Sequence, residues 1–181
     1  MKKSLSTFAM GAAAICLALA PAGHPQTASR MTADNTFVMK AAAGGMAEVQ
    51  LGNLAKSQAS NADVKSFGEQ MVTDHTKAND ELKDIAGKKG ITLPTSLNAK
   101  DQALNDRLSK LQGADFDREY MKAMVSDHRT DVNEFRKESR SGSDPDIKAF
   151  AAKTLPTLEN HLKMAESTDA KVKGAKTKSP Q

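Results

Sequence analysis

The sequence is poor in aromatic residues and nearly free of cysteine. Of its 181 residues only 4% are aromatic, tryptophan is absent, and Cys16 is the single cysteine. Because strands favour aromatic and β-branched side chains, this composition argues against a fold built from β-sheets. The net charge of +4 is small, and basic residues form no block outside the C-terminal end, so nucleic-acid binding is not predicted. The remaining composition, with nine methionines and 39% hydrophobic residues, indicates a small helical protein.

Only one long apolar run is present, over residues 8–20, a few residues after Lys2 and Lys3. It is too short to span a bilayer and ends at Ala20-Pro21-Ala22, so we expect residues 1–22 to be a signal peptide. Lipidation of Cys16 is the minor alternative, because a lipoprotein requires a small residue where Ile15 stands. The mature chain would then contain no disulfide and no transmembrane segment. An exported protein is predicted, with the periplasm as its location.

Hydrophobic periodicity and capping signals predict four long helices. They are expected over 32–58, from the capping signal at 60–63 to Gly90, over 113–139 and over 145–167, with a short helix over 101–111. Residues 32–167 would form the bundle domain, residues 23–31 a flexible lead-in, and residues 168–181 a disordered Lys-rich tail. Amphipathic helices of this kind pack best as an all-α four-helix bundle around one core, here with a short extra connecting helix.

An internal repeat supports the bundle. Residues 71–75, Met-Val-Thr-Asp-His, recur 53 positions later as residues 124–128, Met-Val-Ser-Asp-His. Two helices that carry the same pattern are what a bundle built from duplicated hairpins would contain.

Three of the four histidines lie on the apolar stripes of different helices. These are His75, His128 and His161, and Glu48 has the same kind of position on the remaining helix. Burying one polar group per helix costs about 1–3 kcal/mol for each neutral group unless partners satisfy it, and more for a carboxylate. One metal ion would satisfy all four, so these residues are predicted to bind a transition metal such as Zn, Fe, Mn or Cu.

Aspartates and methionines accompany these histidines. Asp74 and Asp127 each precede a histidine and are expected to reach across the bundle to the histidine of the other repeat, as orienting partners or extra ligands. Three methionines lie within one turn of the histidines and would add thioether ligands suited to copper. They are Met71, Met124 and Met164. Filling of the core is the alternative interpretation for the methionines.

A metal-free interpretation stands beside the metal site. In this interpretation His75 and His128 each pair with the aspartate of the opposite repeat, and Glu48 pairs with His161. The resulting hydrogen-bond network would fix the register of the helices. The protein would then be a structural or interaction module of the cell envelope. No nucleophile with a base, phosphate loop or cysteine pair is visible, so no catalytic residue is predicted. The sequence indicates no particular protein partner and leaves open whether the chain forms a homo-oligomer.

Several motifs resemble the exported bacterial proteins of domain of unknown function family 4142. The resemblance covers residues 33–166 and rests on Phe37, Glu48, residues 71–75, Leu93-Pro94, Phe116-Asp117, Asp127-His128, Leu155-Pro156 and His161-Leu162. It implies a ferritin-like four-helix bundle and carries no established activity. Members are often labelled as outer membrane proteins, which makes outer-membrane association the alternative location. Because no Glu-x-x-His motif is present, a di-iron centre is not predicted.

Overall fold

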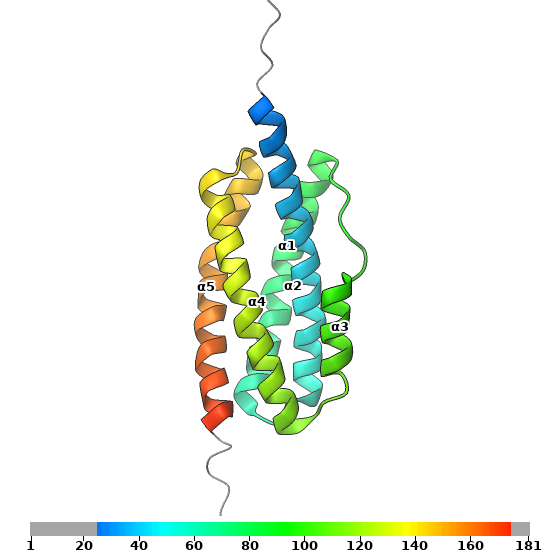
Figure 1. Cartoon of the computed structure of the whole chain (residues 1–181), viewed down its shortest axis with the longest axis vertical. Helices are drawn as coiled ribbons and strands as arrows, with labels where there is room; N and C mark the ends of the chain where they lie inside the picture. Colours follow the sequence, from blue (N-terminus) through cyan, green and yellow to red (C-terminus); the bar gives the residue numbers. More distant parts are fainter. Residues whose placement is uncertain (1–24, 175–181) are drawn as a thin grey trace, which may run out of the picture.

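The computed structural model describes residues 25–174, so the predicted signal peptide and the end of the predicted tail lie outside the described residues. The described part contains five helices and no strand (Figure 1). They are α1 (Pro25–Gln58), α2 (Ala62–Lys89), α3 (Ala99–Leu108), α4 (Gly113–Ser141) and α5 (Pro145–Gly174). The predicted all-α fold, with a short extra helix in the connection between the hairpins, is confirmed.

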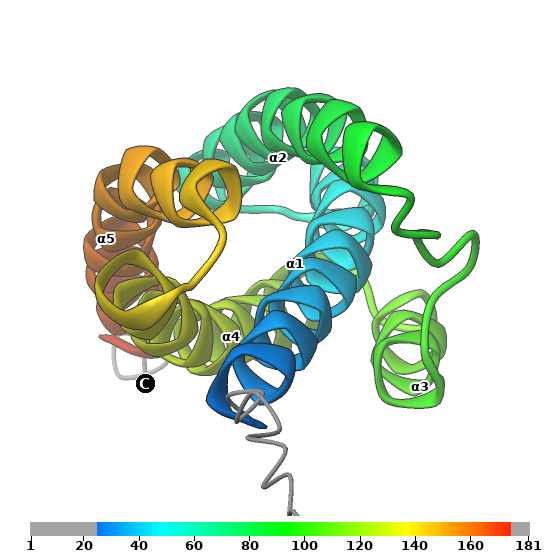
Figure 2. The same cartoon turned by 90° about the horizontal axis from the view of Figure 1, so that it is seen from above.

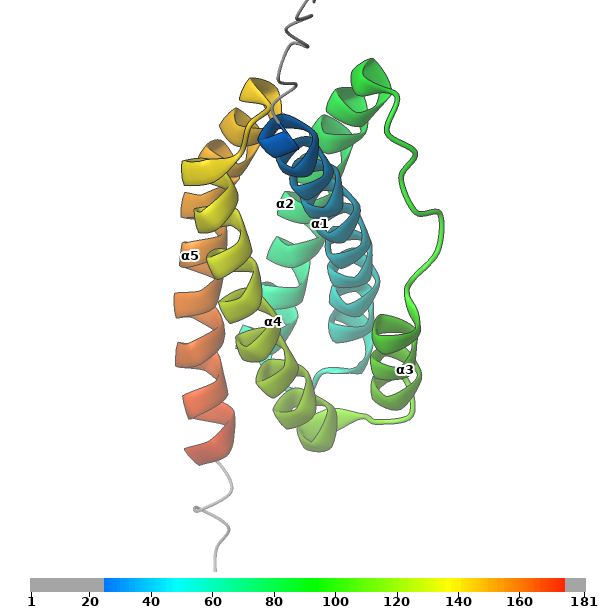
Figure 3. The same cartoon turned by 45° about the horizontal axis from the view of Figure 1, so that its top comes forward.

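The four long helices form two antiparallel hairpins, α1–α2 and α4–α5, which pack side by side (Figure 2). Helix α1 contacts α4 and helix α2 contacts α5, so α2 and α4 occupy opposite corners of the bundle. The connection from α2 to α4 contains α3 and runs along the outside of α1, as Figure 3 shows. This long crossover makes α2 and α4 run in the same direction, the topology of a ferritin-like bundle.

Capping residues set the helix boundaries where the sequence predicted them. Asn61 precedes α2 and its side-chain oxygen accepts hydrogen bonds from the backbone N–H groups of Asp63 and Val64. Gly90 ends α2 with a positive φ of 66°, a conformation that glycine adopts without steric cost. Asp144 accepts from the backbone of the first turn of α5, directly before Pro145.

Both ends of the bundle extend further than expected. Helix α1 begins at Pro25, so it occupies most of the range 23–31 that was predicted to be a flexible lead-in. Proline suits a first helical turn, and no glycine or proline follows in that range to end the helix. Helix α5 continues to Gly174 because Thr168, Asp169 and Val172 are buried against the bundle. The predicted disordered tail therefore does not start at 168.

Two buried aspartates join the hairpins at opposite ends. Asp117 of α4 accepts hydrogen bonds from the backbone N–H groups of Ser60 and Asn61, in the turn between α1 and α2. Asp34 of α1 accepts from the backbone N–H groups of residues 143 and 144, in the turn between α4 and α5. The two sets of residues are related by a constant separation in sequence. Asp117, Ser143 and Asp144 each lie 83 positions after their counterparts, which are Asp34, Ser60 and Asn61. The hairpins α1–α2 and α4–α5 are therefore the related units.

The 53-residue repeat has a different meaning from the one predicted. Its two copies lie on α2 and α4, which are the second helix of one hairpin and the first helix of the other. The shared motif thus does not mark equivalent positions in duplicated hairpins. Because α2 and α4 are parallel, it places His75 and His128 at similar heights, about 20 and 22 Å from the start of their helices.

The apolar core is divided into two clusters. One surrounds Phe67, Phe116 and Tyr120, and the other surrounds Phe37, Phe135 and Phe150. Neither cluster contains the buried Glu48 or the three buried histidines, which lie between them along the helices. Packing on both sides thus holds one polar layer at mid-height.

Candidate metal centre

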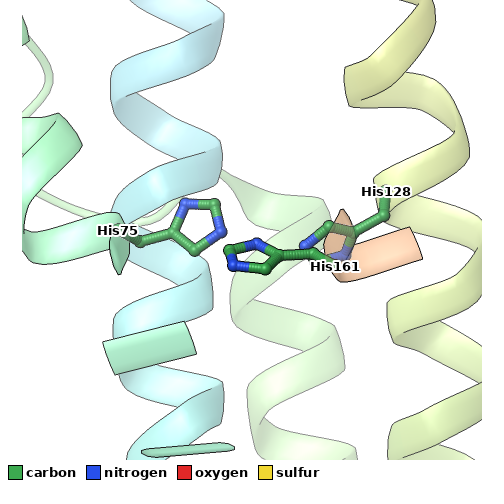
Figure 4. A group of neighbouring side chains, drawn as sticks. All are labelled: His75, His128 and His161. Atoms are coloured by element: carbon green, nitrogen blue, oxygen red, sulfur yellow. The ribbon is translucent and has the colours of Figure 1, made fainter. Parts of the chain in front are cut away.

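Three histidines from three helices converge in the polar layer (Figure 4). His75 comes from α2, His128 from α4 and His161 from α5, and one ring nitrogen from each lies within 4.8 Å of the other two. The ring centroids are 5.4 to 5.8 Å apart. All three side chains are buried, His128 completely. The three histidines that were predicted to share a site therefore lie together in the core.

Each histidine is held through the ring nitrogen that faces away from the cluster centre. Nδ1 of His75 lies 2.8 Å from Oε2 of Glu48, and Nε2 of His161 lies 2.8 Å from Oδ2 of Asp74. Nδ1 of His128 donates to the backbone carbonyl of Met124 at 3.0 Å. A carboxylate or carbonyl behind each imidazole fixes the ring orientation and tautomer, as it does for histidines that bind metal ions.

The remaining three nitrogens have no hydrogen-bond partner. They are Nε2 of His75, Nε2 of His128 and Nδ1 of His161. With neutral rings and the outer nitrogens donating, each carries a lone pair in the buried layer. Three acceptors without a donor are costly to bury, and a cation among them would satisfy all three at once. The donor set therefore fits a transition-metal ion.

Glu48 supplies the compensating negative charge. Burial alone would raise its pKa, but the charges of His75 and His128 and the hydrogen bond with His75 outweigh burial and lower the pKa to about 2. Its second oxygen, Oε1, lies 3.3 Å from Nε2 of His128 and has no hydrogen bond. Glu48 thus stays ionised and offers a free carboxylate oxygen beside the three imidazoles.

The histidines differ in their electrostatics. Burial alone would lower the pKa of His75, but the charge of Glu48, its hydrogen bond and the charge of Asp74 raise it above its ordinary value. Burial and the neighbouring histidines lower the pKa of His161 to about 4, in spite of its hydrogen bond with Asp74. His161 is therefore neutral at pH 7 and can offer a lone pair, whereas the neighbouring Glu48 favours the protonated form of His75.

The aspartates pair differently from the expectation. Asp74 contacts His161, not the histidine of the other repeat, because α2 neighbours α5 and lies diagonally opposite α4. Asp127 bonds Lys100 at 3.3 Å on the bundle surface instead of a histidine. The metal-free pairing expected between Glu48 and His161 is also replaced, since Glu48 hydrogen-bonds His75.

The three methionines lie in or against the apolar cluster that surrounds Phe67, Phe116 and Tyr120. Met71 and Met124 are completely buried there, and Met164 is partly buried beside them. The thioether of Met164 accepts a hydrogen bond from Asn160 at 3.5 Å. Core filling accounts for these positions, and Met124 has a second task through its backbone carbonyl, which orients His128.

Asp131 was not among the predicted site residues. This half-buried carboxylate lies on α4, three residues after His128, and together with Glu48 it lines a cavity of about 20 Å³ inside the bundle. Asp131 also stands 83 positions after Glu48, the same separation that relates the two hairpins. That hairpin separation is the signal that could have identified it.

Comparison with known proteins agrees with this architecture. The chain belongs to the family called domain of unknown function DUF4142, whose sequence profile matches residues 19–168. No curated protein sequence matches it. None of the helices in residues 25–174 has the length and apolar content that a membrane span requires.

Three solved structures are similar to this chain. A DUF305 fragment from Deinococcus radiodurans has a TM-score of 0.68 at 13% identity, with 77% of this chain and 96% of that chain covered. A candidate secreted DUF305 protein from Streptomyces coelicolor has a TM-score of 0.65 at 13% identity, covering 77% and 92%. CopM in its Cu(I)-bound form has a TM-score of 0.62 at 15% identity, covering 74% and 93%. At these identities the likeness shows a shared fold.

Proposed function

We propose that this protein is an exported metal-binding bundle that holds one transition-metal ion on His75, His128 and His161 and serves metal handling or stress protection. The observation that carries the proposal is the set of three inward-facing ring nitrogens without partners. In each histidine the other ring nitrogen is already held by a carboxylate or a carbonyl.

Within this proposal the three imidazoles are the ligands, and Glu48 has two tasks. Its Oε2 orients His75, and its Oε1 stands beside His128 as a fourth donor. Imidazole with a carboxylate suits Zn, Cu and Fe, and the structural neighbour CopM is a Cu(I)-bound protein. The predicted signal peptide and the candidate secreted neighbour support export, with the periplasm as the proposed location.

The hydrogen bonds of Glu48 and Asp74 to histidines also suit a metal-free polar layer that fixes helix register in an envelope module. Elemental analysis separates the two functions. The protein should be purified untagged and without chelator from its export compartment, then melted with Zn(II), Fe(II), Mn(II) and Cu(I). The metal site predicts about one ion per chain and a melting temperature raised by that ion.

His128→Ala should abolish both the bound ion and the shift in melting temperature. His24→Ala is the matched control, because it removes the one histidine that the proposed site does not use. The structural alternative would be established by two results together. The wild-type protein would retain no ion and no added ion would raise its melting temperature, and His128→Ala would only lower the stability.

A further inference from the structure

A surface cleft of about 380 Å³ opens between α1 and α4, beside the connection that contains α3. Five carboxylates and two lysines are among its lining side chains. Both lysines are already paired with cleft carboxylates, Lys40 with Glu134 at 2.7 Å and Lys100 with Asp127 at 3.3 Å. The carboxylates of the cleft thus outnumber its lysines by three, and two of them, Glu48 and Asp131, also reach the bundle interior.

Two carboxylates connect this cleft with the histidine layer. Glu48 and Asp131 line the cleft and also line the internal cavity of about 20 Å³, which His75 borders as well. A cavity of that size holds one water-sized particle. Glu48 is only 3% exposed, and its Oε1 has no hydrogen bond. This buried oxygen lies between the negative cleft and the imidazole nitrogens that have no partner. A cation that moves from the cleft to the histidines would bind to it on the way.

Asp131 is the outer member of the pair. Burial, together with the charges of Glu48, Asp127 and Glu134, raises its pKa well above the ordinary value. Burial is the main cause of this shift, and the three neighbouring carboxylates add to it. Such a charged cleft attracts cations and accelerates their association.

We propose that the α1–α4 cleft is the passage by which the metal ion reaches the histidines, with Asp131 as the outer and Glu48 as the inner carboxylate. This inference rests on the proposed metal-binding function. Asp131 would take the ion from water, and Glu48 would pass it on, since its Oε1 is 3.3 Å from Nε2 of His128.

Gly44 offers a way to block the passage. It lines both the cleft and the internal cavity, and a Cβ added there would meet no heavy atom within 4 Å. Gly44→Leu would place an apolar side chain in the passage, whereas Gly44→Ala would add only a methyl group.

The test measures how fast the full mature protein takes up the ion that the wild type retains, Zn(II) or Cu(I), by stopped-flow competition with a chromogenic chelator. Asp131→Asn should load about tenfold more slowly and reach the same final occupancy. Gly44→Leu should also slow loading, with Gly44→Ala near wild type. Asp80→Asn is the charge-matched control, because Asp80 is exposed and lies on another face.

Wild-type loading rates in both Asp131→Asn and Gly44→Leu would overturn the passage while leaving the histidine site intact. Lower final occupancy of Asp131→Asn at an unchanged rate would make Asp131 a ligand and would also overturn it. A wild-type protein that retains neither ion would refute the proposed function itself.

Discussion

Asp74 Oδ2 lies 2.8 Å from Nε2 of His161, although Asp74 is the direct sequence neighbour of His75. One short segment of α2 therefore contributes both a candidate ligand and the partner that orients a second candidate ligand on α5. The same Asp74 oxygen also accepts a hydrogen bond from Gln70 at 2.6 Å. These hydrogen bonds, to Gln70 and His161, outweigh the effect of burial and lower the pKa of Asp74, so it remains an ionised acceptor.

This arrangement predicts that Asp74→Asn weakens metal binding about 10- to 100-fold at equilibrium, because the amide is a poorer acceptor for His161. The dissociation constant should be measured by competition titration at pH 7. Asp127→Asn is the matched control from the repeated motif and should leave the constant near wild type, since Asp127 bonds Lys100. Equal losses in the two variants would show that Asp74 does not act through His161.

The turn of the first hairpin depends on Asp117. Its carboxylate accepts from the backbone N–H groups of Ser60 and Asn61 and from the Ser60 hydroxyl, at 2.5 to 3.1 Å. Asp117→Ala would remove all three hydrogen bonds from these part-buried donors and should cost about 1–3 kcal/mol of unfolding free energy, measured by urea denaturation. Asp106→Ala, on the exposed face of α3, should cost much less. A neutral Asp117→Ala would contradict its role as a clamp.

Close packing of α1 on α2 depends on Gly68. A Cβ there would lie 2.6 Å from the Cβ of Ala55 and 2.9 Å from the carbonyl oxygen of Gly52, so the helices would have to move apart. Gly68→Ala should therefore destabilise the protein by about 1–3 kcal/mol in thermal or urea unfolding. Gly44→Ala, where a Cβ has open space, should stabilise it by about 0.5–1 kcal/mol through helix propensity. The prediction fails if the two changes have the same sign.

The free energy of unfolding should fall as the pH rises through the range in which Glu138 loses its proton. Burial and the adjacent Asp34 raise the pKa of Glu138 from 4.5 to about 7, so between these values the folded state binds a proton that the unfolded state has lost. Glu138→Gln cannot lose that proton. It should exceed the wild type by about 1–3 kcal/mol at pH 8 and match it near pH 4, as measured by urea unfolding at both values. An advantage that is the same at both pH values would exclude titration of Glu138 as its cause.

Much of the fold followed from local sequence signals. Asn61 and Gly90 bound α2 where the predicted capping signals placed its ends, and α5 begins at the predicted residue 145. The stripes placed Glu48 and the histidines on buried faces, and the structure finds all of them buried. The two ends of the bundle were harder to place, because burial against other helices extends α5 to Gly174.

Local sequence patterns were enough to predict the helices, their apolar faces and the presence of three histidines and a glutamate in the core. These properties depend on residues within one turn of each other, through hydrogen bonding and hydrophobic periodicity. The packed bundle was needed to show which carboxylate holds which histidine, that Asp127 stays at the surface, and that Asp131 and Glu48 line one cavity. Those pairings depend on the rotation and height of each helix relative to its neighbours, which packing across the whole bundle fixes.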